Sequence, residues 1–166
     1  MKKKHFLFIL FLFPFLINAQ EYSHFNNDHF VGLHHWEIPS KDPDRIILNF
    51  HGDPATKRAV TWRTDATVKK GLAQIALAGV NSKFAAKAKT YKATTEQFDL
   101  GLYKSNNSFV VNYHSIIFEE LKPNSTYAYR VGDGKNWSEW IQFKTANDQY
   151  FPTQFVYFGD AQNEIL

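Results

Sequence analysis

Hydrophobic and polar positions alternate over much of this chain, which is the pattern of half-buried β-strands. The clearest case is the run 59–64, in which Val60 and Trp62 share one face. Thr61 and Arg63 lie on the other face of the same run. The pattern therefore predicts a strand that places Trp62 in a hydrophobic core.

Six or seven strands are predicted along the chain, separated by turn sequences. They lie at 45–50, 59–64, 72–78, within 81–107, at 109–118, within 121–132 and at 140–145. The run 72–78 suits a strand or a helix, but the glycines on either side bracket only seven residues, which favours a strand. Asp133-Gly134 predicts a tight hairpin turn. With no convincing helix, the fold class is all-β, an antiparallel sandwich.

A different pattern occurs near the end of the sequence. The segment 155–158 is an uninterrupted apolar run, and Gly159 and Asp160 follow it. This arrangement is typical of a buried strand in an α/β domain, which delivers a ligand to the edge of a parallel sheet. Asp160 is therefore a candidate site residue, although an aspartate here also suits a helix cap. Without a sheet to join, the run is expected to be disordered or to promote association.

The first 19 residues have the three parts of a secretory signal peptide: a lysine-rich start, an apolar stretch at 6–17, and a small residue at Ala19. The alternative is a membrane anchor. The apolar stretch contains Pro14 and is only 12 residues long, against roughly 20 needed for a span. We therefore expect cleavage after Ala19 and a secreted or periplasmic protein.

Removal of this segment changes the charge of the chain. It takes away Lys2, Lys3 and Lys4, so the 19 basic residues fall to 16 against 16 acidic ones. The mature chain is thus neutral and gives no support to a nucleic-acid or membrane partner. The absence of cysteine excludes disulfides and thiolate sites, and the remaining 147 residues suffice for one domain.

Four histidines lie in the N-terminal arm 20–41: His24, His29, His34 and His35. Their spacing does not place them on one helix face, so the local indication of a metal site is weak. The alternatives are a loop that packs on the domain surface and a metal-scavenging arm that binds zinc.

Two segments resemble a fibronectin type III domain. Leu121-Lys-Pro-Asn-Ser-Thr-Tyr127 is similar to its tyrosine corner, in which the phenol of Tyr127 would bond to the preceding turn. Val60-Thr-Trp62 resembles its core tryptophan strand. Together with the segments 44–54, 114–134, 137–138 and 143–145, they resemble the N-terminal domain of purple acid phosphatases.

In that family the sandwich precedes a calcineurin-like metallophosphoesterase domain, whose first strand ends in Gly-Asp. The resemblance implies that Asp160 is the first metal ligand of a dinuclear centre of iron, zinc or manganese. Related enzymes often have a histidine two residues later, where this chain has Gln162, a weaker ligand. The family's other ligand segments have no counterpart, so we expect no catalytic residue here and no tight metal binding by this chain.

The sequence thus predicts the N-terminal part of a secreted metallophosphoesterase that hydrolyses phosphate esters, truncated and inactive alone. Its partner would be the missing C-terminal domain. The predicted segments are a signal peptide at 1–19, an arm at 20–41, a sandwich at 42–146, a linker at 147–151, and an α/β domain start at 152–166. The alternative function is a stand-alone fibronectin-like module that binds a cell-surface carbohydrate or protein.

Overall fold

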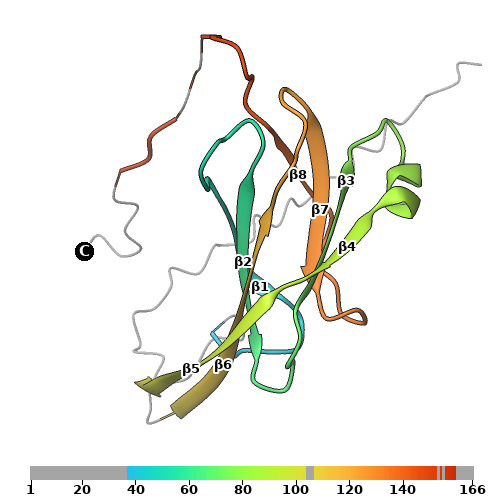
Figure 1. The fold of residues 1–166 in the computed structure, drawn as a ribbon. Coiled ribbons are helices and arrows are strands. Elements are labelled where there is room, and N and C mark those ends of the chain that lie inside the picture. Colours follow the sequence, from blue (N-terminus) through green and yellow to red (C-terminus); the bar gives the residue numbers. More distant parts are fainter. Residues whose placement is uncertain (1–36, 104–106, 153, 155, 160–166) are drawn as a thin grey trace, which may run out of the picture. The chain divides into compact units, whose positions relative to one another are not determined.

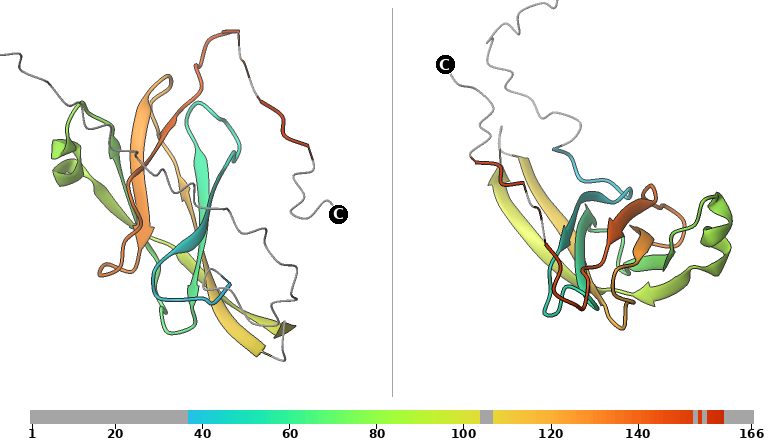
Figure 2. Two further views of the ribbon diagram at one scale, coloured as in Figure 1. Left: turned by 180° about the vertical axis from the view of Figure 1, so that it is seen from behind. Right: turned by 90° about the horizontal axis from the view of Figure 1, so that it is seen from above.

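The computed structural model describes residues 37–159 except 104–106, 153 and 155, and in this part the chain forms two antiparallel four-stranded sheets (Figure 1). The strands are β1 (Asp44–Asn49), β2 (Arg58–Asp65), β3 (Leu72–Leu77), β4 (Lys89–Lys92), β5 (Thr94–Tyr103), β6 (Asn107–Phe118), β7 (Thr126–Gly132) and β8 (Ile141–Lys144). One sheet has the order β1-β2-β6-β5 and the other β4-β3-β7-β8. Figure 2 shows the sheets from two further sides. The predicted all-β sandwich is confirmed.

The segment 81–107, in which one strand was expected, differs most from its prediction. It holds a 3-10 helix, η1 (Ser82–Lys87), then β4 and a β5 of ten residues. Asn81 caps η1 by accepting a hydrogen bond from the Lys83 N–H at 3.1 Å. A 3-10 helix of six residues makes only about two turns and is too short to show a helical period, which explains why the pattern did not reveal it.

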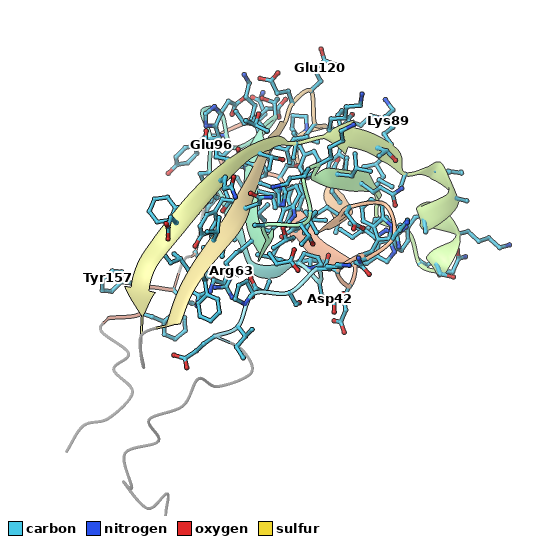
Figure 3. The ribbon with its side chains drawn as sticks, turned by 90° about the horizontal axis from the view of Figure 1, so that it is seen from below. Asp42, Arg63, Lys89, Glu96, Glu120 and Tyr157 are labelled. Atoms are coloured by element: carbon cyan, nitrogen blue, oxygen red, sulfur yellow. The ribbon has the colours of Figure 1, made fainter. Side chains whose placement is uncertain are left out.

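β4 and β5 form an almost continuous strand that passes from one sheet to the other, with only Ala93 between them. In Figure 3, Lys89 and Glu96 lie on this single ribbon. The Ala93 N–H donates to the carbonyl of Gly71 at 2.9 Å and holds the crossing point against the turn before β3. The crossing thus joins the two layers covalently.

The core lies between the sheets and is rich in aromatic side chains. Val60 and Trp62 are fully buried, as the alternation predicted. Around them pack the other members of the cluster: Ala73, Ile75, Phe118, Leu121, Tyr127, Tyr129, Val131 and Phe143. In a chain without cysteine, the burial of this apolar surface is the main source of stability.

Arg63 is more deeply buried than a half-buried strand would allow, with only 1% of its surface exposed. β2 lies between β1 and β6, and Arg63 is paired in register with Asp44. The guanidinium Nε donates to Asp44 Oδ1 at 2.8 Å, and Nη2 donates to Oδ2. This ion pair compensates the buried charge of Arg63. Since Trp62 on one face and Arg63 on the other are both buried, both faces of β2 are covered.

The tyrosine corner is present at the start of β7. The backbone N–H of Lys122 donates to the phenol oxygen of Tyr127 at 2.8 Å, which confirms the predicted bond from the side chain to the preceding turn. The ring of Tyr127 is buried and stacks on Phe143 of β8. The corner therefore fixes the turn to the core at the end of the sandwich where β8 also ends.

Candidate functional site

The metal-ligand candidates lie outside the described residues. These are Asp160 and Gln162, together with the arm histidines His24, His29, His34 and His35. Within the part of the chain that is described, no group of three or more His, Cys, Asp or Glu could hold a metal ion. The described side chains therefore do not fit a dinuclear metal centre.

The described residues just before Asp160 lie outside the two sheets. Residues 156–159 have no regular secondary structure, and the exposed fractions of Val156, Tyr157 and Phe158 are 77%, 85% and 83%. A strand needs a neighbouring strand for its backbone hydrogen bonds, and no described strand pairs with these residues. An exposed apolar segment of this kind is typical of a surface that contacts another protein domain.

The sequence His51-Gly52-Asp53 lies in the turn between β1 and β2. Gly52 has a φ of +62°, a conformation that favours glycine. The Asp53 carboxylate accepts hydrogen bonds from the Ala55 N–H at 2.9 Å and from the Thr56 hydroxyl at 2.8 Å. These bonds lower the pKa of Asp53 and keep the carboxylate ionised within its own turn. The motif has a structural role in the turn.

The turn that follows Asp53 is one of two turns that bind the backbone where the chain leaves the sandwich. We call residues 144–146, with the turns 53–57 and 122–125, the exit junction. Ala146 N–H donates to the Pro54 carbonyl at 3.0 Å, and the Ala146 carbonyl accepts from the Asn124 N–H at 2.8 Å. The backbone that follows β8 is thus tied to two turns from distant parts of the sequence.

Two side chains complete the exit junction. The Thr145 hydroxyl donates to the Lys122 carbonyl at 2.7 Å and accepts from the Ser125 N–H at 2.9 Å. Arg58 is buried, and its Nη1 donates to the carbonyls of Pro54 at 2.7 Å and Lys57 at 2.8 Å. Because these bonds satisfy backbone groups that turns leave unpaired, the exit of the chain is fixed in direction.

His114 of β6 is fully buried, and its position in an alternating strand was the only sign of this in the sequence. Its Nε2 is 2.9 Å from the Thr64 hydroxyl and its Nδ1 is 2.8 Å from the Thr95 hydroxyl. The ring stacks on Trp62 with 5.2 Å between centroids. Burial lowers the pKa of His114, so the neutral imidazole is favoured. A side chain closed off from solvent stabilises the core and has no access to a substrate.

His114 predicts a pH dependence of stability. The unfolded chain gains a proton on this side chain below a pH of about 6.5, whereas the folded protein resists protonation because the pKa is lowered. Stability is therefore expected to fall as the pH decreases from about 6.5, by up to about 1.4 kcal/mol per pH unit. Urea denaturation of the wild type and His114→Gln at several pH values checks this. An equal slope in both proteins between pH 6.5 and 5 would show that His114 does not titrate on unfolding.

The described residues contain no helix long and apolar enough to cross a membrane. The predicted signal segment 1–19 lies outside these residues and stays a prediction.

Comparison with known proteins gives three relevant likenesses. An acid phosphatase type 7 of Danio rerio is 26% identical over 127 residues, which are 74% of this chain and 26% of that protein. The structure of a purple acid phosphatase from yellow lupin seeds is 17% identical, with a TM-score of 0.46, and 66% of this chain covers 20% of it. A fibronectin type III domain of human contactin 1 is 15% identical, with a TM-score of 0.45, and 70% of this chain covers 86% of it.

The chain spans about a quarter of the length of the curated relative that it matches, because the match covers 26% of that protein. The sequence model that describes the N-terminal domain of purple acid phosphatases matches residues 43–145. This range begins just before β1 and ends at the exit junction, so it coincides with the observed sandwich. Because it also spans more than half of the sequence, the chain belongs to the family of purple acid phosphatase N-terminal domains.

Proposed function

We propose that this sandwich is the non-catalytic N-terminal domain of a secreted or periplasmic metallophosphoesterase. Its role is to hold a following α/β domain in a fixed orientation while that domain hydrolyses phosphate esters. In this proposal residues 42–146 are the sandwich, 147–151 the linker and 152–166 the first part of the catalytic domain. The observation that carries the proposal is the exit junction, where Ala146 is bonded to two separate turns.

Three further features support this role. The family match ends at residue 145, within the exit junction, so the end of the match and the fixed backbone fall at the same place. The segment after it exposes large apolar side chains, including Tyr150 at 100% and Phe151 at 67% of their surface. Such side chains are suited to burial in a second domain. The match covers 26% of the curated relative, so most of that protein lies outside the matched region.

Asp160 is proposed as the first metal ligand of the following domain. The family implies iron, zinc or manganese, but the described side chains of this chain do not offer a group that fits a metal pair. We therefore propose that the 166-residue chain has no phosphatase activity by itself, because one carboxylate cannot hold two cations.

An activity assay tests the proposed inactivity of the chain. The chain is supplied with zinc, iron or manganese and an aryl phosphate, beside an Asp160→Ala variant. We expect both to hydrolyse the ester at the rate of the metal alone. Turnover by the chain well above that of the variant would contradict inactivity.

The role of the following domain needs a separate experiment. The genomic sequence beyond codon 166 is read for a metallophosphoesterase domain, and the joined protein is expressed with and without Asp160→Ala. Metal-dependent activity that is lost in the variant is the expected result. A terminator directly after the codon for Leu166, with no such domain nearby, would favour the stand-alone binding module instead.

A further inference from the structure

The fold gathers lysines that are far apart in the sequence. Five of them line two adjoining surface hollows of about 420 and 350 Å³: Lys41, Lys69, Lys70, Lys92 and Lys135. They come from the segment before β1, the turn between β2 and β3, β4, and the turn between β7 and β8. A mature chain that is neutral overall therefore concentrates positive charge in one place. We call these five residues the lysine track.

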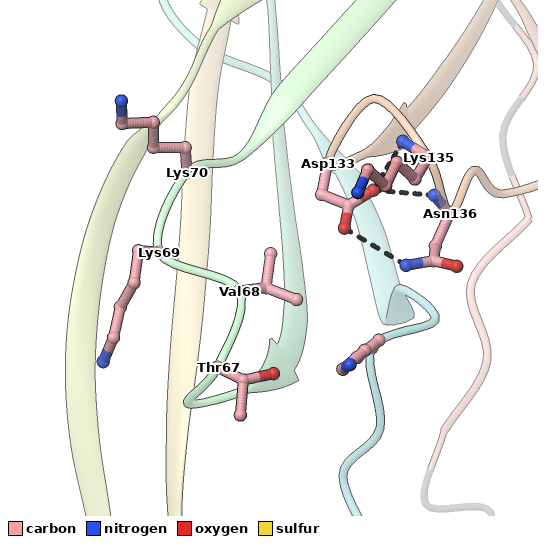
Figure 4. A pocket seen from close by; sticks show the side chains of 8 residues that line it. Thr67, Val68, Lys69, Lys70, Asp133, Lys135 and Asn136 are labelled. Carbon is pink, nitrogen blue, oxygen red and sulfur yellow. Dashed lines mark hydrogen bonds between the residues drawn. The ribbon is translucent and has the colours of Figure 1, made fainter.

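Both hollows are lined by residues of the β2–β3 turn. The first lies between Thr67 and Val68 of that turn and Asp133 and Asn136 of the β7–β8 turn (Figure 4). Thr95 and the backbone of Gly71 contribute to the second hollow, beside Lys92.

Lys69 and Lys70 line both hollows. In Figure 4 their side chains extend away from Asp133. Lys41 and Lys135 remain at the first hollow. The positive charges thus follow a path across the turn and do not converge on a single point.

The opposing negative charge along this path is small. Asp133 is the single carboxylate among the residues that line the hollows. Burial opposes its ionisation, but the N–H groups of Lys135 and Asn136 donate to Oδ1 at 2.7 and 2.6 Å and lower its pKa. The Asn136 amide holds Oδ2 at 3.1 Å. This carboxylate is therefore engaged within its own turn.

None of the five lysines forms an ion pair with another described residue. The two ion pairs in that part of the chain are Lys57 with Glu119 and Arg63 with Asp44. Several like charges brought together without partners favour the binding of an anion. Because lysine acts as a point charge with rotatable donors, it suits phosphate groups presented in many orientations.

The lining also indicates which kind of polyanion fits. It contains no Phe, Tyr or Trp, so nucleobases would find no aromatic surface to stack on. Two hollows joined by shared lysines suit an extended ligand better than one small ion. We propose that the lysine track binds a chain of linked phosphate groups without bases, such as inorganic polyphosphate. The choice of phosphate over other anions rests on the proposed function, for which such a chain would be a substrate held close to the catalytic domain.

The test measures binding of fluorescently labelled polyphosphate to the full chain by anisotropy at low salt. Lys69→Gln/Lys70→Gln is compared with Lys83→Gln/Lys87→Gln, which removes the same charge from η1, outside both hollows. We expect at least about fivefold weaker binding for the first variant and less than about twofold for the second. Lys41→Gln/Lys135→Gln, which changes the first hollow alone, and Lys92→Gln, which changes the second alone, should each weaken binding, and the two losses together would place the ligand across both hollows. Thermal unfolding checks that all variants fold.

Several outcomes would overturn the proposal. Equal losses in the track and η1 variants would mean that the polymer responds to net charge alone. Complete displacement by orthophosphate at the same phosphate concentration would indicate a single-ion site. Single-stranded DNA of equal charge that competes equally well would indicate a general polyanion or nucleic-acid surface. Because the assay needs no hydrolysis, absence of binding would refute the lysine track and leave the proposed function untouched.

Discussion

Replacing Trp62 by alanine is expected to lower the free energy of unfolding by about 3 to 5 kcal/mol, which is the usual cost of emptying a large buried aromatic site. Trp62 is fully buried and stacks on His114. Its removal would leave a cavity between the sheets, and it would also take away one face of the environment that keeps His114 neutral. Urea denaturation followed by circular dichroism measures the effect.

Trp62→Phe is the informative control. The indole Nε1 is buried and has no hydrogen-bond partner among the described residues, so the native side chain already carries an unsatisfied donor. Phenylalanine removes this donor and keeps most of the apolar volume, so we expect a clearly smaller loss than for alanine. An unchanged unfolding midpoint for Trp62→Ala would show that Trp62 is not in the core.

Gly132→Ala is expected to destabilise the domain by about 3 kcal/mol, at the upper end of the range for overpacking. A Cβ atom at this position would lie 2.0 Å from the carbonyl oxygen of Asn136 and 3.0 Å from the Cα of Trp137. Both are backbone atoms of the turn that follows β7, so no side-chain rotation can relieve the clash. The end of β7 and its bridge to Trp137 would have to move.

Gly79→Ala is a matched control for this substitution. A Cβ there would meet its nearest atoms at ordinary contact distances of 3.7 and 3.9 Å, so we expect a change within about 0.5 kcal/mol. Thermal and urea denaturation of both variants provide the comparison. Similar stabilities for the two would mean that the turn after β7 relaxes at little cost.

The architecture could be predicted because its determinants are local in the sequence. Alternation placed Val60 and Trp62 on the core face, and the resemblance of residues 121–127 to a fibronectin tyrosine corner predicted the bond between Tyr127 and the preceding turn. The strand interpretation of 72–78 also holds, since β3 covers Leu72–Leu77. Side-chain period and turn residues act over a few positions, so a single sequence contains them.

Features that depend on distant residues could not be predicted in this way. The burial of Arg63 needs Asp44 on the neighbouring strand, and the hydrogen bonds of the buried His114 ring need Thr64 and Thr95 from two other strands. The lysine track forms only when four separate segments meet. For the run before Asp160 the apolar sequence is typical of a strand, but none of the described strands pairs with it. A strand also depends on a distant partner, which a local pattern does not contain.

The exit junction has a consequence for the order of folding. Its bond from Ala146 to Pro54 joins the last residues of the domain to the first turn, so it can close only after every strand of the sandwich has emerged from the ribosome. β-sandwiches are dominated by such long-range pairings and fold in milliseconds to seconds, whereas synthesis adds roughly 5 to 20 residues per second. The sandwich would therefore have time to form while the following domain of our proposal is still being synthesised. That domain would begin to fold next to a backbone that the exit junction already holds in place.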